Sequence, residues 1–197
     1  MPVPAFGPNG HLPLGRHPAS MTEVQEAFVD APVFAESTSR RPCWEGLQTY
    51  LELWSRLEEK IDAACEGRNL LKCLWLAGSF ISDKINPSNI DVTLIVEADI
   101  LARAARMGLG ASRPLKSLSA REKALKDFRV SPIIIKYTYF RSPFPGGFEP
   151  EQAEYQQLRG GFDDWWCRLR QAGEDKQAPT VETSEWRRGY LEVVRGD

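Results

Sequence analysis

The chain has 197 residues, of which 42% are hydrophobic and 26% are charged, a composition that suits one domain with a substantial core. The formal charge of -2 and the isoelectric point near 5.8 exclude a global basic field, so net charge does not indicate nucleic-acid binding. The sequence shows no apolar run of ~18 residues and no signal-peptide pattern. We therefore expect no membrane span and a cytoplasmic protein.

The cysteines are widely spaced and include no C-x-x-C pair: Cys43, Cys65, Cys73 and Cys167. The only histidines that could join them in a zinc site are His11 and His17, both in the first twenty residues. We therefore expect reduced, partly buried thiols, with neither a structural zinc site nor a disulfide framework.

The first twenty residues contain five prolines and three glycines, which disfavour both a helix and a strand ladder. We expect residues 1–20 to form an extended arm, followed by a single domain over residues 21–197. Ser20 and Glu23 have the spacing of a capping box, which predicts a short helix over about residues 21–30.

The middle of the chain changes from a helical to a strand pattern. Apolar residues at spacings of three and four predict a long amphipathic helix over about residues 44–65. Two apolar runs of strand length follow at 70–78 and 90–98, and the second is rich in β-branched residues. Only about ten residues separate these two expected strands.

The rest of the chain continues to alternate. We expect a helix capped by Asp99 that runs to Met107, a loop at 108–117, a helix capped by Ser119 and Glu122 that runs to about residue 128, and a third strand at 131–140. A helix from about Glu151, an aromatic block from 162, a polar loop at 173–183 and a short apolar run at 189–194 follow. Interleaved helices and strands indicate an α/β (α+β) sheet domain.

One stretch carries a recognisable pattern. Residues 75–96, WLAGSFISDKINPSNIDVTLIV, place an apolar strand before Gly78-Ser79 and a second strand around Asp91. This arrangement resembles the signature of the nucleotidyltransferase-fold superfamily, which includes polymerase-β-like enzymes, antibiotic nucleotidyltransferases and small toxin-antitoxin nucleotidyltransferases. The resemblance implies a minimal nucleotidyltransferase-like mixed sheet flanked by helices, with a triphosphate held at the Gly-Ser turn. It also implies two carboxylates that bind Mg²⁺ from one face of the second strand.

A narrower resemblance extends to both ends of the chain. The segments NGHLPLGRH, LWLAGSF and GYLEVV are similar to those of a small bacterial and phage-associated family of uncharacterised function, built on a minimal nucleotidyltransferase core.

The sequence departs from the superfamily pattern at the metal-binding positions. In one register Asn89 takes the place of the first carboxylate and Asp91 that of the second. In the other register Asp91 comes first and Thr93 second. Both registers lack one negative charge, so we expect Mg²⁺ binding to be weak or absent and name Asp91 as its only certain ligand.

The remaining candidate residues have two interpretations each. Gly78 and Ser79 either contact a phosphate or only form a turn, and Lys84 either reaches a phosphate or is solvated. Lys136, in the third strand where the superfamily usually has another carboxylate, either contacts a phosphate or faces solvent.

The sequence alone does not decide the roles of several other residues. Trp165 and Trp166 could stack a base or close a core, Arg187 and Arg188 could line a cleft or face water, and the histidines of the arm could donate to a ligand. Several acids could replace the missing carboxylate, and no spacing selects among them: Asp83, Glu97, Asp127, Asp163 and Asp164.

Two functions fit these patterns. The first is a non-catalytic binding or regulatory module with a degenerate metal site, which would bind an NTP or a protein partner, for example in a toxin-antitoxin or phage-defence assembly. The second is an active Mg²⁺-dependent enzyme that transfers an NMP from an NTP to a protein, RNA or small-molecule acceptor. The missing carboxylate favours the first.

Overall fold

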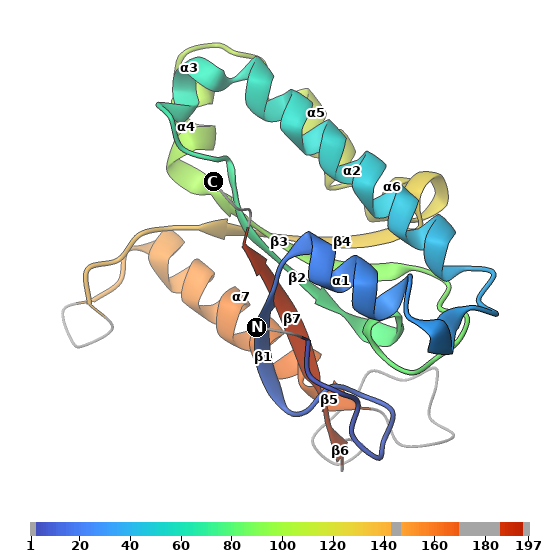
Figure 1. Ribbon diagram of the computed structural model, residues 1–197. Helices are drawn as coiled ribbons and strands as arrows, with labels where there is room; N and C mark the ends of the chain where they lie inside the picture. Colours follow the sequence, from blue (N-terminus) through green and yellow to red (C-terminus); the bar gives the residue numbers. More distant parts are fainter. Residues whose placement is uncertain (1–2, 143–146, 170–185, 195–197) are drawn as a thin grey trace.

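The computed structural model describes residues 3–142, 147–169 and 186–194 (Figure 1). The fold is mixed α/β, as the sequence predicts. Its main sheet has five strands in the order β1-β7-β2-β3-β4, and a short second sheet pairs β5 with β6. The strands are β1 (Gly15–Ala19), β2 (Leu71–Ala77), β3 (Ile90–Glu97), β4 (Val130–Tyr137), β5 (Arg168–Leu169), β6 (Trp186–Arg187) and β7 (Gly189–Val194).

The main sheet is mixed in strand direction. β2 runs antiparallel to both of its neighbours, β7 and β3, whereas β1 is parallel to β7 and β4 is parallel to β3. As a result, β2 ends at the same edge of the sheet where β3, β4 and β7 begin. The GYLEVV segment, which the sequence analysis describes as a short apolar run, forms strand β7. It lies between β1 and β2 and pairs with both.

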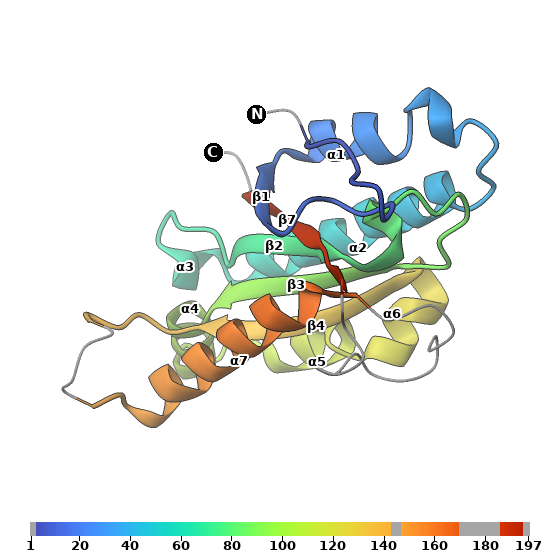
Figure 2. The same ribbon diagram turned by 90° about the horizontal axis from the view of Figure 1, so that it is seen from below.

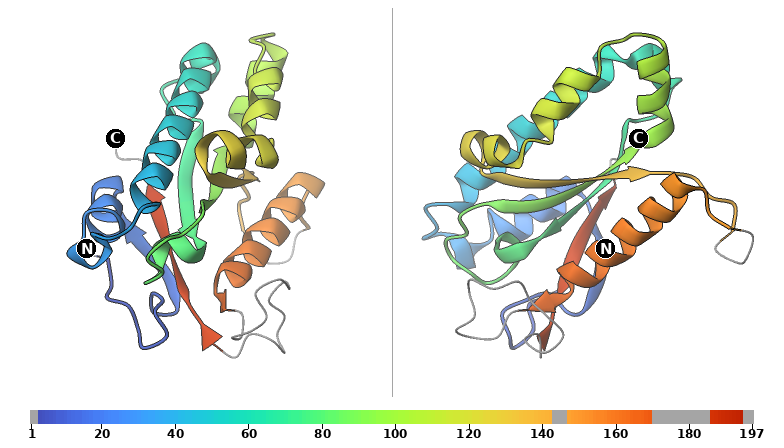
Figure 3. Two further views of the ribbon diagram at one scale, coloured as in Figure 1. Left: turned by 90° about the vertical axis from the view of Figure 1, so that its right-hand side faces the viewer. Right: turned by 180° about the vertical axis from the view of Figure 1, so that it is seen from behind.

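Helices cover both faces of the sheet. They are α1 (Met21–Phe28), α2 (Arg40–Lys60), α3 (Asp62–Cys65), α4 (Ala98–Arg106), α5 (Ser112–Leu118), α6 (Arg121–Phe128) and α7 (Pro150–Trp166), with 3-10 turns η1 (Pro32–Phe34) and η2 (Gly78–Ile81). Figure 3 shows α2, α5 and α6 on one side of β4 and α7 on the other, and Figure 2 shows α7 lying across β3 and β4. In the described ranges, no helix combines the length and apolarity required to cross a lipid bilayer.

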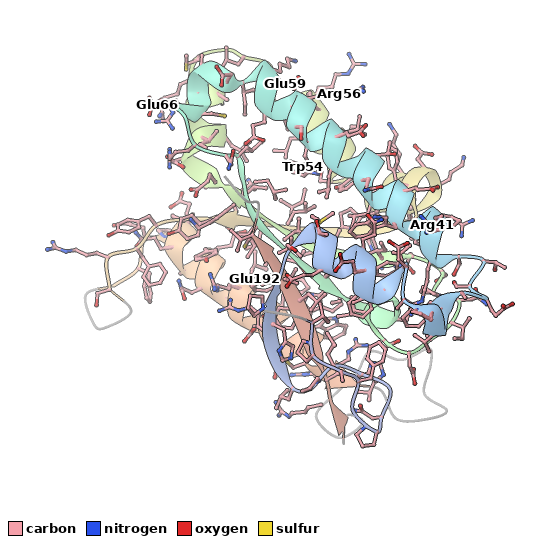
Figure 4. The ribbon with its side chains drawn as sticks, in the orientation of Figure 1. Arg41, Trp54, Arg56, Glu59, Glu66 and Glu192 are labelled. Atoms are coloured by element: carbon pink, nitrogen blue, oxygen red, sulfur yellow. The ribbon has the colours of Figure 1, made fainter. Side chains whose placement is uncertain are left out.

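The central strands are buried on both faces, which explains why their sequences read as continuous apolar runs. Trp54 lies on the side of α2 that faces the sheet and is 1% exposed, whereas Arg56 projects outward from the same helix (Figure 4). All four cysteines are buried and unpaired, as expected.

The N-terminal arm differs from the prediction. Gly15–Ala19 form strand β1, so the expectation that this segment avoids a strand ladder is wrong for these five residues. The physical reason is position: β1 is an edge strand, where Pro18 and its missing N–H are tolerated. The capping box is confirmed, because Glu23 N donates to Ser20 Oγ at 3.1 Å and Ser20 N donates to Glu23 Oε2 at 2.8 Å.

The helices also differ from the prediction in extent and capping. The long helix begins at Arg40 and is interrupted at Ile61, where φ is -110° and ψ is 20°. The expected loop at 108–117 contains helix α5, because Pro114 lies in its first turn, where a missing amide costs no intrahelical bond. Neither Asp99 nor Ser119 caps its helix; Asp99 instead pairs with Arg68. The polar loop expected at 173–183 lies outside the described residues.

Candidate anion-binding cleft

A cleft of about 790 Å³ opens at the edge of the sheet where β2 ends and β3 and β4 begin. Strand pairing places Ala77 beside Asp91 and Asp91 beside Ser131, so three strands contribute to its floor. Gly78 and Ser79 of η2 and the C-terminal end of α7 form its walls. The volume lies in the range of small-molecule sites.

Gly78 and Asp91 meet too closely for any side chain at position 78. Gly78 has φ +76°, and an added Cβ would overlap Asp91 Oδ2. The close approach therefore requires glycine for two reasons, the left-handed backbone and the lack of space. It locks the Gly-Ser turn against the start of β3.

The Asp91 carboxylate is held by polar neighbours in a partly buried position. Burial raises its pKa above the ordinary value, while hydrogen bonds from Ser131 and Asn89 and the charges of Arg188 and Arg121 oppose that rise. Asn89 Nδ2 donates to Asp91 Oδ1 at 3.2 Å. The carboxylate thus already satisfies much of its hydrogen-bonding capacity within the protein.

Neither position suggested for a second carboxylate offers a metal ligand to the cleft. Asn89 turns its amide nitrogen toward Asp91, and its Oδ1 accepts from Ser88 Oγ at 3.0 Å. Thr93 is fully buried, and its Oγ1 accepts a hydrogen bond of 2.8 Å from Trp166 Nε1.

Positive side chains surround the single carboxylate. The cleft is lined by Lys84, Arg121, Arg168 and Arg188. Arg168 forms an ion pair with Asp164. Four basic side chains and one carboxylate make the described lining predominantly basic, in contrast to the net negative charge of the whole chain.

Two of these cations are positioned by specific contacts. Arg121, the first residue of α6, donates from Nε to Ser131 Oγ at 2.9 Å, which ties the helix start to the beginning of β4. Arg188 donates from Nε to the carbonyl oxygen of Trp166 at 3.3 Å, just before β7 begins.

Arg40 holds the loop that carries Lys84 through hydrogen bonds to its backbone. This side chain is 1% exposed, and its guanidinium donates to the carbonyl oxygens of Phe28, Phe80, Ser82 and Lys84 at 2.9, 2.7, 2.7 and 2.6 Å. It also lies over the Phe34 ring, 3.5 Å from the centroid. Burial lowers the pKa of Arg40 to about 10, which leaves it charged at neutral pH.

The two tryptophans of α7 have different surroundings. Trp166 is 5% exposed and bonded to Thr93, so it closes the core. Trp165 is only partly buried and lines the cleft with Phe162. Trp165 is therefore the tryptophan placed to meet a ligand ring.

Lys136 does not join the cleft. It pairs with Val96, five residues beyond the Asp91–Ser131 pair, which corresponds to roughly 16 Å along the strand. It lines a separate pocket with Glu151 and Glu154. The interpretation of Lys136 as a ligand of the same phosphate is therefore not supported by its position.

The acids considered as replacements lie elsewhere as well, and among the described residues Asp91 is the only acid that lines the cleft. Asp163 accepts from Tyr190, Asp164 pairs with Arg168, and Glu97 pairs with Lys72. Asp127 borders a different pocket. Within the described ranges, no three His, Cys, Asp or Glu side chains are grouped to hold a metal.

A two-Mg²⁺ centre does not fit the part of the cleft lining that the structure describes. Such a centre requires carboxylates that bridge or flank two cations about 3.5–4 Å apart. Here one carboxylate is engaged by Ser131 and Asn89, and the charges of Arg121 and Arg188 act on it. Like charges in that position oppose a divalent cation.

The two histidines of the arm also lie outside the cleft lining. His11 forms a bridge with Ser82, and burial, followed by the charge of Arg188, lowers its pKa to about 4. Its Nδ1 is buried with no hydrogen-bond partner in the described part of the chain. His17 Nε2 lies 2.8 Å from the carbonyl oxygen of Pro13.

Comparison with known protein families gives one match, to a family of unknown function, DUF6932, over residues 4–193. The chain belongs to the DUF6932 family. No curated protein and no solved structure matches it.

In this DUF6932 chain, sequence reasoning missed Arg121, Ser131 and Arg40. Arg121 and Ser131 flank a helix-to-strand connection, and no motif spacing links them to Asp91. Arg40 precedes the helix that the apolar spacing predicts from residue 44, so its place in the first turn of α2 was not anticipated. Arg188 was considered, and the structure places it in the cleft while Arg187 is exposed.

Proposed function

We propose that the chain is a nucleotide-binding module on a nucleotidyltransferase-like scaffold, with a regulatory rather than a catalytic role. The observation that carries the proposal is the convergence of Gly78, Ser79 and Asp91 with basic side chains on one cleft. The turn and the carboxylate belong to adjacent antiparallel strands, the arrangement that the superfamily resemblance implies.

The lining suggests how a nucleoside triphosphate would be held. Lys84, Arg121 and Arg188 would contact the phosphates, since guanidinium and ammonium groups are the usual partners of phosphate oxygens. The Ser79 hydroxyl would add a hydrogen bond, and Trp165 would stack on the base. A volume of about 790 Å³ accommodates a ligand of this size.

The non-catalytic part of the proposal depends on charge. Phosphoryl and nucleotidyl transfer rely on electrostatic stabilisation, and loss of one important contact costs about 3 kcal/mol, or ~100-fold in rate. Only Asp91, among the described residues, lines the cleft as an acid, and its oxygens are engaged by the protein. A regulatory role would work through a protein partner that responds to nucleotide occupancy.

Two measurements test this proposal. Equilibrium dialysis with labelled ATP and GTP should show binding that is lost in a Lys84→Gln/Arg121→Gln double variant and kept in Lys136→Gln. Incubation with labelled NTPs, Mg²⁺ or Mn²⁺ and a cell extract should show no transfer above an Asp91→Ala control. Asp91-dependent labelling of any acceptor would establish an active enzyme instead, and absence of nucleotide binding would refute the module.

A substitution at Asn89 tests whether the missing second carboxylate is what limits Mg²⁺ binding. Asn89 Nδ2 lies 3.2 Å from Asp91 Oδ1, so Asn89→Asp places a second carboxylate beside the first. We expect this variant to gain Mg²⁺-dependent ATP binding in calorimetry. Asn89→Gln, which adds no charge, is the matched control and should show no gain.

A further inference from the structure

We propose that a second pocket, between β1 and α7, binds a small oxyanion, the carboxylate or phosphate group of a metabolite-sized molecule. The pocket has a volume of about 480 Å³, within the range of small-molecule sites. It shares α7 with the cleft but uses a different side of that helix. Phe162 and Trp165 line the cleft, whereas Arg159, Gly160 and Asp163 line the second pocket. The proposal does not depend on nucleotide binding.

Arg159 brings a guanidinium without a direct anionic partner to this pocket. Its Nη1 donates to the Tyr155 hydroxyl at 2.6 Å, which supplies no negative charge. Among the described residues, no carboxylate lies within 4.0 Å of this guanidinium. The Glu192 carboxylate is engaged elsewhere, since its Oε2 pairs with Arg16 at 3.3 Å and accepts from Trp75 Nε1 at 2.9 Å. The other donors of Arg159 are therefore left for a ligand.

Gln156 adds a second donor that lacks an acceptor. Its Nε2 is buried and has no hydrogen-bond partner in the described part of the chain. Buried polar groups without a partner are rare in native proteins, because they lose their hydrogen bonds to water. Gln156 and Arg159 are three residues apart on α7, so their side chains are neighbours, and both line the pocket. The soft terminal torsion of Gln lets the amide turn toward a ligand oxygen that also contacts Arg159.

Gly160 keeps the pocket open. Gly160 and Gly161 lie in the interior of α7, where glycine disfavours the helix relative to alanine. Neither has a positive φ, and a Cβ at either position would meet no atom of the described residues within 4 Å. Backbone conformation and packing therefore do not require glycine here. Gly160 lines the pocket, so its missing side chain leaves room for a ligand to approach the helix closely.

Asp163 restricts the kind of anion that fits. It lines the pocket about one helical turn beyond Arg159, and its Oδ1 accepts a hydrogen bond from the Tyr190 hydroxyl. Its negative charge would repel an extended polyanion such as a triphosphate. We therefore expect a ligand with one small anionic group, held by Gln156 and Arg159, that differs from the nucleotide of the cleft.

The experiment is an NMR titration of the full chain labelled with ¹⁵N-glycine, with inorganic phosphate and, separately, acetate as probes. Gly160 reports on the pocket and Gly78 on the cleft. We expect a saturable shift of the Gly160 signal with a Kd of about 1 mM for at least one probe. The tighter probe identifies the group as a phosphate or a carboxylate. Arg159→Gln should weaken the Gly160 response about tenfold, whereas Lys84→Gln should leave it unchanged.

A pair of glycine variants tests the pocket independently of charge. Gly160→Ala and Gly161→Ala should each raise the Tm by about 3 °C, because alanine favours the helix. Only Gly160→Ala should weaken anion binding, read from the Gly161 signal, because Gly161 does not line the pocket among the described residues.

Three outcomes overturn the inference. They are the absence of a saturable Gly160 shift with both probes, a shift of unchanged affinity in Arg159→Gln, and equal anion affinity in the two alanine variants. Circular dichroism of each variant establishes that affinity is compared between folded proteins. The Gly78 signal tests the cleft separately, so failure of either site leaves the other intact.

Discussion

Asp91 lies near the N-terminal end of β3, and Glu97 is the last residue of this strand. The two carboxylates interact with basic side chains in different ways. Glu97 forms ion pairs with Lys72 at 3.3 Å and Arg68 at 3.9 Å. Asp91 has no ion pair within 4.0 Å in the described ranges, and the neighbouring guanidiniums border a cleft.

This difference shows that acidic and basic side chains can either pair directly with each other or border a binding cleft. At the Glu97 end, a buried carboxylate pairs directly with the half-exposed side chains of Lys72 and Arg68. At the Asp91 end, the charged side chains lie around a cleft. The Gly78 turn, the buried Arg40 side chain and the adjacent strands fix the backbone that carries them. We therefore expect substitutions at the cleft end to have the larger effects.

The largest expected effect contrasts Arg40 with Arg68. Arg40→Met should lower the free energy of unfolding by about 4 kcal/mol, because it leaves the buried carbonyls of the cleft loop without donors. Arg68→Met, at the Glu97 end of β3, removes only the ion pairs of a half-exposed guanidinium and should cost at most about 1 kcal/mol. Urea unfolding measures both, and equal losses would remove the distinction between the two ends.

The second contrast uses two glycines with the same backbone. Gly78 and Gly67 both have φ +76°, but only Gly78 has neighbours where a Cβ would lie. Gly67→Ala should cost about 1 kcal/mol for the backbone alone, and Gly78→Ala about 3 kcal/mol because overpacking is added. If chemical denaturation gives the same loss for both, the close approach of Gly78 to Asp91 is not a constraint on the fold.

A third prediction concerns pH and the partly buried His11. Its folded pKa of about 4 lies below the ordinary 6.5, so its contribution to stability is present at neutral pH and is lost as pH falls through this window. Between pH 7.5 and pH 5 the wild-type chain should lose about 2 kcal/mol that a His11→Gln variant does not lose. Parallel pH profiles for the two proteins would contradict burial of a neutral imidazole.

The smallest expected effect compares the two carboxylates directly. Burial raises the pKa of Asp91, so its ionised form opposes folding at neutral pH, and this cost disappears as pH falls below the ordinary Asp range. Asp91→Asn should therefore be slightly more stable than wild type at pH 7, with the difference vanishing in acid. Glu97→Gln should instead lose up to about 1 kcal/mol. Thermal unfolding at pH 7 and pH 4 should show these opposite signs.

Local patterns in the sequence were enough to predict several elements. The β-branched and apolar runs predicted β2, β3 and β4, and the Ser20–Glu23 spacing predicted the start of α1. The short connection between β2 and β3 also suits their antiparallel pairing, which brings the end of β2 beside the start of β3.

The rest depended on contacts between distant segments. Pro18 could be accepted in β1 only because that strand lies at the edge of the sheet, and pairing with β7 joins residues more than 170 positions apart. The register of β3 with β4 placed Ser131, and not Lys136, beside Asp91.

The sequence by itself determined the Gly-Ser turn, the single carboxylate and the strands that carry them, because these follow from periodicity and short-range connection. Only the tertiary structure decided that Arg121 and Arg188 stand around Asp91 and that Lys136 does not. The physical reason is that helix packing and strand register set the direction of each side chain. Neither is encoded in the local spacing of charged residues.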